Sequence, residues 1–206
     1  MSARRHRLVP AALAVLWLAA GAAAGPPLPA ATPLAGAHDD FTELLELLAA
    51  RRHGRVSFTE VHDMAMLERP LRSSGELLYE APDRLEKRTL EPRPETLILE
   101  HGVLTAQRGH RTHVLRLHDY PQLVPFVESI RATLAGDRAA LEHYFHVQFS
   151  GDLGHWRLEL VPVDATVART VRDIRISGER EAIRSVEIRQ GDGDHSLLTI
   201  GAEVPP

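Results

Sequence analysis

The spacing of apolar residues changes from a helical to a strand period shortly after residue 50. Apolar residues recur every three or four positions within 39–53, and Asp40 with Glu43 forms a capping box at the start of this segment. Beyond it, apolar and polar residues alternate, so that Val56 and Phe58 fall on one face of the chain. The pattern predicts one amphipathic helix followed by a strand.

Short alternating segments separated by turn residues fill most of the remaining chain. The predicted strands cover residues 55–61, 75–80, 85–90, 96–100, 103–107, 112–117, 145–149, 156–160, 171–177, 183–190 and 196–200. Asp192-Gly193 lies between the last two and is a strong hairpin signal. Many short strands joined by tight turns are typical of an antiparallel meander.

Residues 125–144 interrupt this series of strands with helical spacing. Phe126, Val127 and Ile130 share one helical face, and Gly136-Asp137 is expected to end one helix and to cap the next. A twisted sheet of about ten strands exceeds the common size and tends to curl. The predicted fold class is therefore α+β, mainly β: a curved antiparallel sheet or incomplete barrel, covered on one side by two to three helices.

The first 24 residues have the layout of a cleavable signal peptide. Arginines 4, 5 and 7 precede an apolar run over 8–20, and Ala22-Ala23-Ala24 supplies the small residues of a cleavage site. The apolar run is shorter than the roughly 20 residues of a membrane-spanning helix, which favours cleavage over anchoring. Residues 25–38, rich in proline and alanine, are a predicted linker, and 39–206 are a predicted single domain.

Composition narrows both the compartment and the chemistry. The chain contains no cysteine, so a disulfide, a thiolate metal site and a lipidated N-terminal cysteine are excluded. An exported protein without cysteine fits a Gram-negative periplasm. The formal charge of −4 becomes −7 without the three signal arginines, which disfavours nucleic acid as a partner.

Histidine pairs are the best candidates for metal binding or catalysis. The pairs are His110 with His113, His143 with His146, His118 with Asp119, and Asp194 with His195. A zinc site needs three or four converging ligands, and positions three apart on a strand point to opposite faces. We therefore favour ordinary polar histidines and expect no catalytic residue, metal or cofactor. A periplasmic hydrolase or metal-dependent enzyme that uses these pairs remains the alternative.

The apolar positions of so wide a sheet outnumber those that a small helical lid can cover. Such a sheet can enclose a cavity for a hydrophobic ligand, and eight buried methylenes supply roughly 6 kcal/mol before association costs. A dry core, and with it a structural domain that binds no ligand, is the simpler interpretation of the periodicity alone. The candidate lining consists of Phe58, Leu77, Tyr79, Leu97, Leu99, Phe149, Trp156, Leu158 and Leu160.

Several short motifs, in a shared order over about residues 41–200, resemble the periplasmic outer-membrane lipoprotein carriers, the LolA-like family. The motifs are Phe58-Thr59-Glu60, Gly75 to Tyr79 followed by Pro82, Thr96 to Leu99 with Gly102, Trp156 to Pro162, and Ile183 to Ile188 followed by Asp192. The resemblance implies an unclosed antiparallel half-barrel with a helical lid.

The resemblance implies carriage and not catalysis. Members of the family accept an acylated lipoprotein from an inner-membrane release complex, shield its acyl chains under the lid, and pass it to an outer-membrane receptor. By resemblance, this chain is expected to be a monomeric carrier of acylated lipoproteins or of a lipid-like cargo, such as a glycolipid or an aryl-polyene lipid.

One position departs from the family pattern. Typical carriers have an arginine directly before the proline that follows the glycine-led strand, and this arginine holds the lid shut. The present chain has Ala81 there, and the nearby Arg84 and Arg88 do not occupy the matching position. Lid closure is therefore expected to differ from that of typical carriers.

Overall fold

The structure is a computed structural model and describes residues 37–204. The expected signal peptide and residues 25–36 of the expected linker lie outside this part of the chain. The helices are α1 (Ala37–Ala50), η2 (Leu117–Asp119), η3 (Pro121–Leu123), α2 (Val124–Ala135), α3 (Arg138–Tyr144) and α4 (Ala165–Thr170). The strands are β1 (His53–Asp63), β2 (Leu71–Glu80), β3 (Arg84–Glu91), β4 (Glu95–Glu100), β5 (Val103–Arg108), β6 (Arg111–Arg116), β7 (Phe145–Asp152), β8 (His155–Pro162), β9 (Val171–Glu179), β10 (Ala182–Gln190) and β11 (His195–Glu203).

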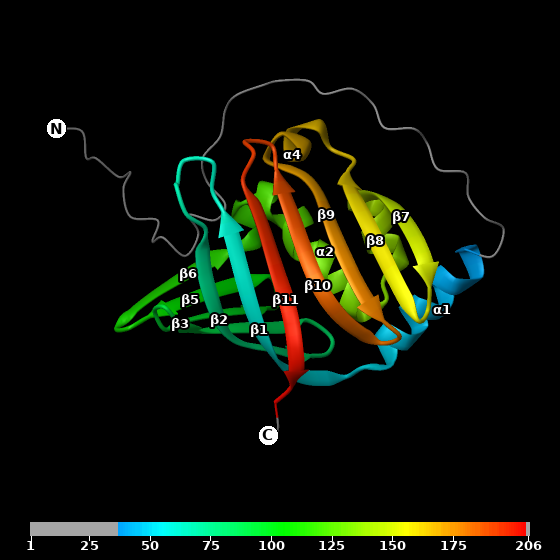
Figure 1. The fold of residues 1–206 in the computed structure, drawn as a ribbon, viewed down its shortest axis with the longest axis horizontal. Helices are drawn as coiled ribbons and strands as arrows, with labels where there is room; N and C mark the ends of the chain where they lie inside the picture. The colour runs from blue at the N-terminus through cyan, green and yellow to red at the C-terminus, as the bar shows by residue number, and fades with distance from the viewer. Residues whose placement is uncertain (1–36, 205–206) are drawn as a thin grey trace.

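All these strands form one 11-stranded antiparallel sheet, in the order β6-β5-β4-β3-β2-β1-β11-β10-β9-β8-β7. The sheet curves but does not close, and β6 and β7 are its two edges (Figure 1). The first and last strands pair in its middle, where Thr59 lies opposite Thr199. The predicted fold class, a curved unclosed antiparallel sheet with a few helices, is confirmed.

The topology of the sheet explains why helices cover one of its faces. Strands β6 and β7 follow each other in the sequence but lie at opposite edges, so the connection between them has to cross the sheet. Helices α2 and α3 make this crossing, and α1 lies on the same side of the sheet (Figure 1). We call the covered side the inner face.

The junction between α2 and α3 has the geometry that its sequence predicts. Gly136 adopts a left-handed conformation with φ of 64°, and its N–H donates to the last turn of α2. The side chain of Asp137 then accepts a hydrogen bond from the N–H of Ala140, which caps α3. Glycine is required at 136 because an added Cβ would lie 2.2 Å from the carbonyl oxygen of Leu45.

The packed core occupies the half of the molecule that contains β7 to β10. Four apolar residues of α1, namely Phe41, Leu44, Leu45 and Leu48, are at most 5% exposed there. They belong to a cluster with Leu141 of α3 and with inner-face residues of the strands; these are Phe145, Trp156, Leu158, Leu160, Ile174, Ile176 and Val186. A smaller cluster of Leu99, Leu117 and Leu123 joins β4 to the two short 3₁₀ helices.

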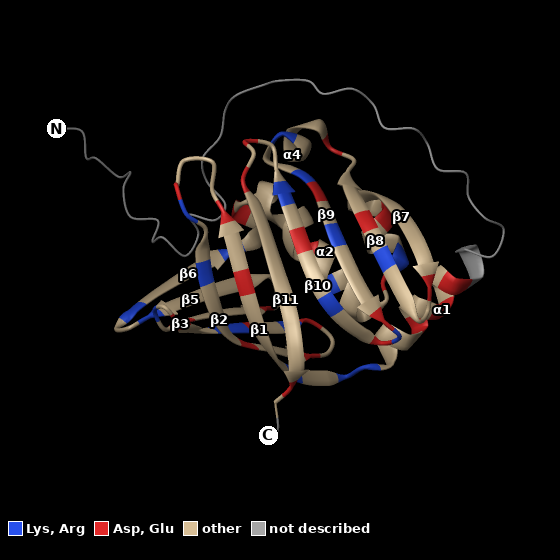
Figure 2. Ribbon diagram, in the orientation of Figure 1, with Lys and Arg blue, Asp and Glu red and all other residues tan. Residues whose placement is uncertain are grey.

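Charged residues of both signs are interleaved along β8, β9 and β10 (Figure 2), and several of them pair on the face opposite the helices, which we call the outer face. Arg175 pairs with Glu159 at 3.0 Å, and Arg189 pairs with the buried Asp173 at 2.8 Å. Because successive side chains of a strand alternate between faces, the same strands present apolar residues to the core. On these strands the outer face is thus mainly charged and the inner face mainly apolar.

Two details differ from the sequence-based expectations. Helix α1 begins at Ala37, so Asp40 lies inside its first turns and is not the residue that caps it. An acidic residue there is still favourable, because the first turn of a helix is the positive end of its dipole. The short helix α4 was not expected, although Asp164 caps it by accepting from the N–H groups of Thr166 and Val167.

Within residues 37–204, the structure contains no helix with the length and apolar character needed to cross a membrane.

Candidate functional site

A cavity of about 370 Å³ lies between the inner face of the sheet and α2. Ligand pockets in proteins are commonly about 300 to 1,000 Å³, so this one has room for a small ligand or part of a lipid chain. Helix α2 contributes Phe126, Val127, Ile130 and Leu134 to it. Apolar lining from the strands comes mainly from Val56, Leu77, Tyr79, Leu85, Leu97, Leu99, Leu104, Ile176, Ile183, Val186, Ile188, Leu198 and Ile200.

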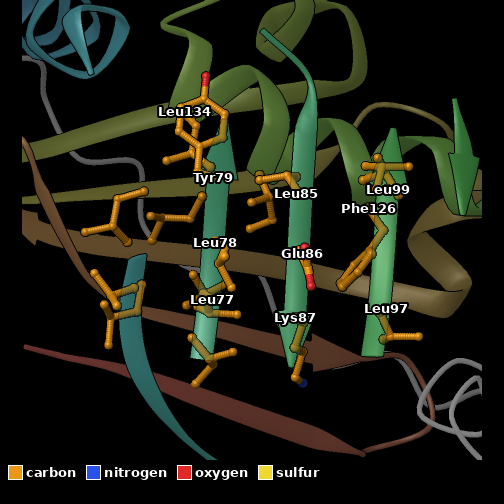
Figure 3. A pocket seen from close by; sticks show the side chains of 18 of the residues that line it. Leu77, Leu78, Tyr79, Leu85, Glu86, Lys87, Leu97, Leu99, Phe126 and Leu134 are labelled. Atoms are coloured by element: carbon orange, nitrogen blue, oxygen red, sulfur yellow. The ribbon is translucent and has the colours of Figure 1, made fainter. Parts of the chain in front are cut away.

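The register of the strands explains why these side chains converge. Val56 lies opposite Leu77, Leu77 opposite Lys87, and Lys87 opposite Leu97, so one row crosses β1 to β4 on the inner face. The next row contains Tyr79, Leu85, Leu99 and Leu104. Figure 3 shows members of both rows beside Phe126 and Leu134 of α2.

Tyr79 lies at the end of the cavity close to Leu134 (Figure 3). Its side chain is 9% exposed. Burial raises the pKa of its phenol, an effect that the positive charges of Arg52 and Arg131 reduce. The phenol is therefore neutral at physiological pH and adds a polar hydroxyl to a mainly apolar wall.

An ion pair interrupts the apolar wall towards the other end. Lys87 Nζ lies 2.6 Å from Oε2 of Glu60, and both residues line the cavity. Ser73 donates a hydrogen bond to the same carboxylate oxygen at 3.0 Å. The ammonium also lies 5.0 Å from the centroid of the Phe58 ring, within the range of a cation–π contact.

Four of the nine residues expected to line a cavity do so, namely Leu77, Tyr79, Leu97 and Leu99. The other five lie elsewhere. Phe58 is 2% exposed and lies beneath the Lys87 ammonium. Phe149 stacks on Phe41 of α1 with a centroid separation of 5.8 Å. Trp156, Leu158 and Leu160 are in the packed core.

Sequence reasoning missed the α2 residues and the lining from β9 to β11. The helical spacing of Phe126, Val127 and Ile130 marked a helix, but it could not say that this face covers an open cavity and not a dry core. It also missed Lys87, because a lysine in an alternating strand is normally placed on the hydrated face. Leu85 and Thr89, two positions before and after Lys87, lie on the same face as Lys87. This alternation was the signal in the sequence that could have placed Lys87 on the inner face.

Apolar packing of α1 and α3 on the core attaches the lid to the sheet. The N–H of Ala81 donates to the carbonyl oxygen of Arg52 at 2.8 Å, which joins the turn after β2 to the start of β1. The Arg138 guanidinium of α3 lies 5.2 Å from the centroid of the Phe41 ring on α1. This second contact joins two helices of the lid to each other. Arg84 and Arg88 both pair with Glu86 instead of contacting the lid.

The histidine pairs lie outside the cavity lining. His118 and Asp119 form an exposed pair at 3.0 Å, and the ring of His143 contacts Tyr144 edge to face. His195 lies 3.1 Å from Glu187. Among residues 37–204, no group of three or more His, Asp or Glu side chains is placed to hold a metal ion.

The fold and cavity define a class of protein: an open antiparallel half-barrel with an apolar interior under a helical lid. Residues 31–204 match the family model described as outer membrane lipoprotein carrier protein LolA-like, and the chain therefore belongs to this family. The resemblance inferred from the short sequence motifs is confirmed. The members of this family are described as carriers and not as enzymes.

Solved structures with a similar arrangement have little sequence identity to this chain. One is a LolA superfamily protein from Nitrosomonas europaea, which is 11% identical to this chain with a TM-score of 0.46. The match covers 82% of this chain and 93% of the Nitrosomonas protein. Another is a putative outer membrane lipoprotein-sorting protein domain from Vibrio parahaemolyticus, 11% identical, with a TM-score of 0.42 and coverages of 82% and 92%. A third is LprF from Mycobacterium bovis, 10% identical, with a TM-score of 0.36 and coverages of 85% and 96%. No curated protein matches the chain.

Proposed function

We propose that this protein is a periplasmic carrier that binds acyl chains of lipoproteins, or of a lipid-like conjugate, in the cavity beneath α2. The apolar cavity is the single observation that carries the proposal. Membership of the lipoprotein carrier family supports the same function independently.

The physical basis is the transfer of acyl chain from water to the apolar wall. Each methylene that leaves water contributes about 0.8 kcal/mol, so partial burial of one chain offsets a large part of the cost of association. An acyl chain in the cavity would contact aliphatic side chains on both sides, from Leu77 and Leu97 of the sheet and from Ile130 of α2. The charged outer face keeps the loaded carrier in solution.

The proposal includes a route. The signal-like segment over residues 1–24 supports export to a Gram-negative periplasm. An acylated cargo would enter from an inner-membrane release complex or exporter and leave at an outer-membrane receptor. The carrier would act as a monomer, without nucleic acid, metal or cofactor.

A transfer assay tests carriage directly. Donor vesicles hold a diacylated peptide with a fluorophore, acceptor vesicles hold a quencher, and the chain from residue 25 onward is added in catalytic amount. The proposal predicts quenching at a rate proportional to protein concentration. A rate equal to that of vesicles alone would contradict it.

A further inference from the structure

The ion pair between Glu60 of β1 and Lys87 of β3 is set into the wall of the apolar cavity. Their side chains are 17% and 26% exposed, so water solvates the two charges only in part. A partly buried ion pair adds little to stability, because the cost of desolvating the two charges offsets much of their attraction. Two apolar side chains at these positions would stabilise the fold about as well. The pair is therefore a candidate for a role in binding.

The ammonium keeps capacity for another acceptor. Lysine has three N–H donors. Within the described part of the chain, Lys87 has one hydrogen-bond acceptor, Glu60, and one ring face, that of Phe58. Both partners fix the position of Nζ at the wall of the cavity, where a group on a bound chain can reach it.

The charge of Glu60 decides which acceptor fits best. Because this carboxylate already neutralises Lys87, an anionic head would add an uncompensated negative charge in a place of low dielectric. A carbonyl oxygen can accept from the ammonium without adding any charge.

We propose that Glu60 and Lys87 form a polar subsite for the carbonyl of an uncharged acyl ester or amide, whose hydrocarbon chain occupies the cavity. This inference rests on the proposed function and adds the class of head group. From Lys87 the chain would run past Leu77 and Leu85 towards Tyr79 and Leu134, the arrangement visible in Figure 3.

The test compares three amphiphiles of equal chain length by displacement of Nile red. Monomyristoylglycerol has the ester carbonyl, its ether analogue has the same glycerol head without the carbonyl, and myristate has an anionic head. The wild-type chain is expected to bind the ester about tenfold more tightly than the ether. One hydrogen bond from a charged donor contributes about this factor to an affinity. Myristate is expected to bind less tightly than the ester.

Two substitutions separate the roles of the two charges. Lys87→Met is expected to bring the ester-to-ether ratio close to one. Glu60→Gln removes the competing negative charge, so myristate is expected to gain about tenfold and to overtake the ester. Arg157→Met is the matched control, because Arg157 is an exposed cation on the outer face of β8, opposite Ser150, and does not line the cavity.

The outcomes distinguish this inference from the proposed function. If the ether displaces Nile red but Lys87→Met leaves the ester-to-ether ratio unchanged, the polar subsite is refuted and the carrier function stands. If no amphiphile displaces the dye from the wild type, both fail. Should Lys87→Met not fold, Glu60→Gln decides: an unchanged ranking of myristate and ester refutes the subsite.

Discussion

Phe41 of α1 and Phe149 of β7 stack with 5.8 Å between their ring centroids and 29° between their planes. The contact fixes the first helix of the lid to the β7 edge of the sheet, beside the packed core. Helix α2, in contrast, has the cavity beneath its Phe126 and Ile130. The lid therefore has a part that closes the core and a part that covers the binding space.

Phe41→Ala is expected to lower stability without preventing ligand binding. Loss of a buried phenylalanine costs about 3 kcal/mol or more, and Phe41 is 5% exposed but does not line the cavity. Urea denaturation followed by circular dichroism measures the change. A variant as stable as the wild type would show that the Phe41 ring does not contribute to the closed core.

Leu97→Glu is expected to abolish loading of a fluorescent fatty acid while the protein remains folded. Leu97 is half-buried and lines the cavity, so a carboxylate there meets the acyl chain directly. Thr96→Glu is the matched control, since Thr96 is the adjacent residue of β4 and points to the outer face, opposite Arg88. Retained loading by a folded Leu97→Glu protein would contradict the position of the cavity.

The same charge at Leu158 is expected to give a different result. Leu158 is 0% exposed within the packed core, so Leu158→Glu should prevent folding and not merely loading. The contrast between positions 97 and 158 separates a cavity wall from a core, although both residues lie in alternating strands.

Gly178→Ala is expected to displace the indole of Trp156. A methyl group at 178 would lie 2.3 Å from Cζ2 of that ring, whose Nε1 donates to the carbonyl oxygen of Arg180 at 2.8 Å. Crowding of this kind costs about 1 to 3 kcal/mol, and the emission of Trp156 should shift to longer wavelength. At Gly154, by contrast, the atom that an added methyl would meet first is Asp152 Oδ1 at 3.0 Å, at the end of a side chain. Equal effects of Gly154→Ala and Gly178→Ala would refute the packing argument.

Tyr79 is expected to ionise at a higher pH than an unperturbed tyrosine, because burial raises its pKa above the usual value of about 10. The neutral phenol is the form that the folded state favours, so its contribution to stability is complete below pH about 10 and is lost as pH rises through the raised pKa. The difference in tyrosinate absorbance between the wild type and Tyr79→Phe during alkaline titration isolates this group and should show it ionising above pH about 10. A difference curve with the midpoint of a free tyrosine would contradict the raised pKa.

Local signals in the sequence predicted the turns and the strands well. Gly136-Asp137 separates two helices and Asp192-Gly193 forms a hairpin, because these residues set the backbone through their own conformations and hydrogen bonds. The place of the cavity was only half predictable. Leu97 and Leu158 both lie in predicted strands and were both expected to face the interior, but Leu97 lines the cavity and Leu158 lies in the packed core.

Charged residues on the inner face were also beyond the reach of the sequence pattern. Lys87 and Glu60 come from strands that do not neighbour each other, and their meeting depends on the width of β2 and the curvature of the sheet. The apolar packing by which α1 and α3 attach the lid to the sheet was not predicted either, because it joins residues far apart in the sequence.

Native mass spectrometry tests the central claim most directly. The chain would be expressed with its signal segment in a Gram-negative periplasm, purified without detergent, and measured intact before and after lipid extraction. The carrier function predicts an added mass that extraction removes and that fragments into acyl chains, and it predicts loss of this mass in Leu97→Glu but not in Thr96→Glu. A wild-type protein that carries no extractable mass and also ignores a fluorescent fatty acid would contradict it.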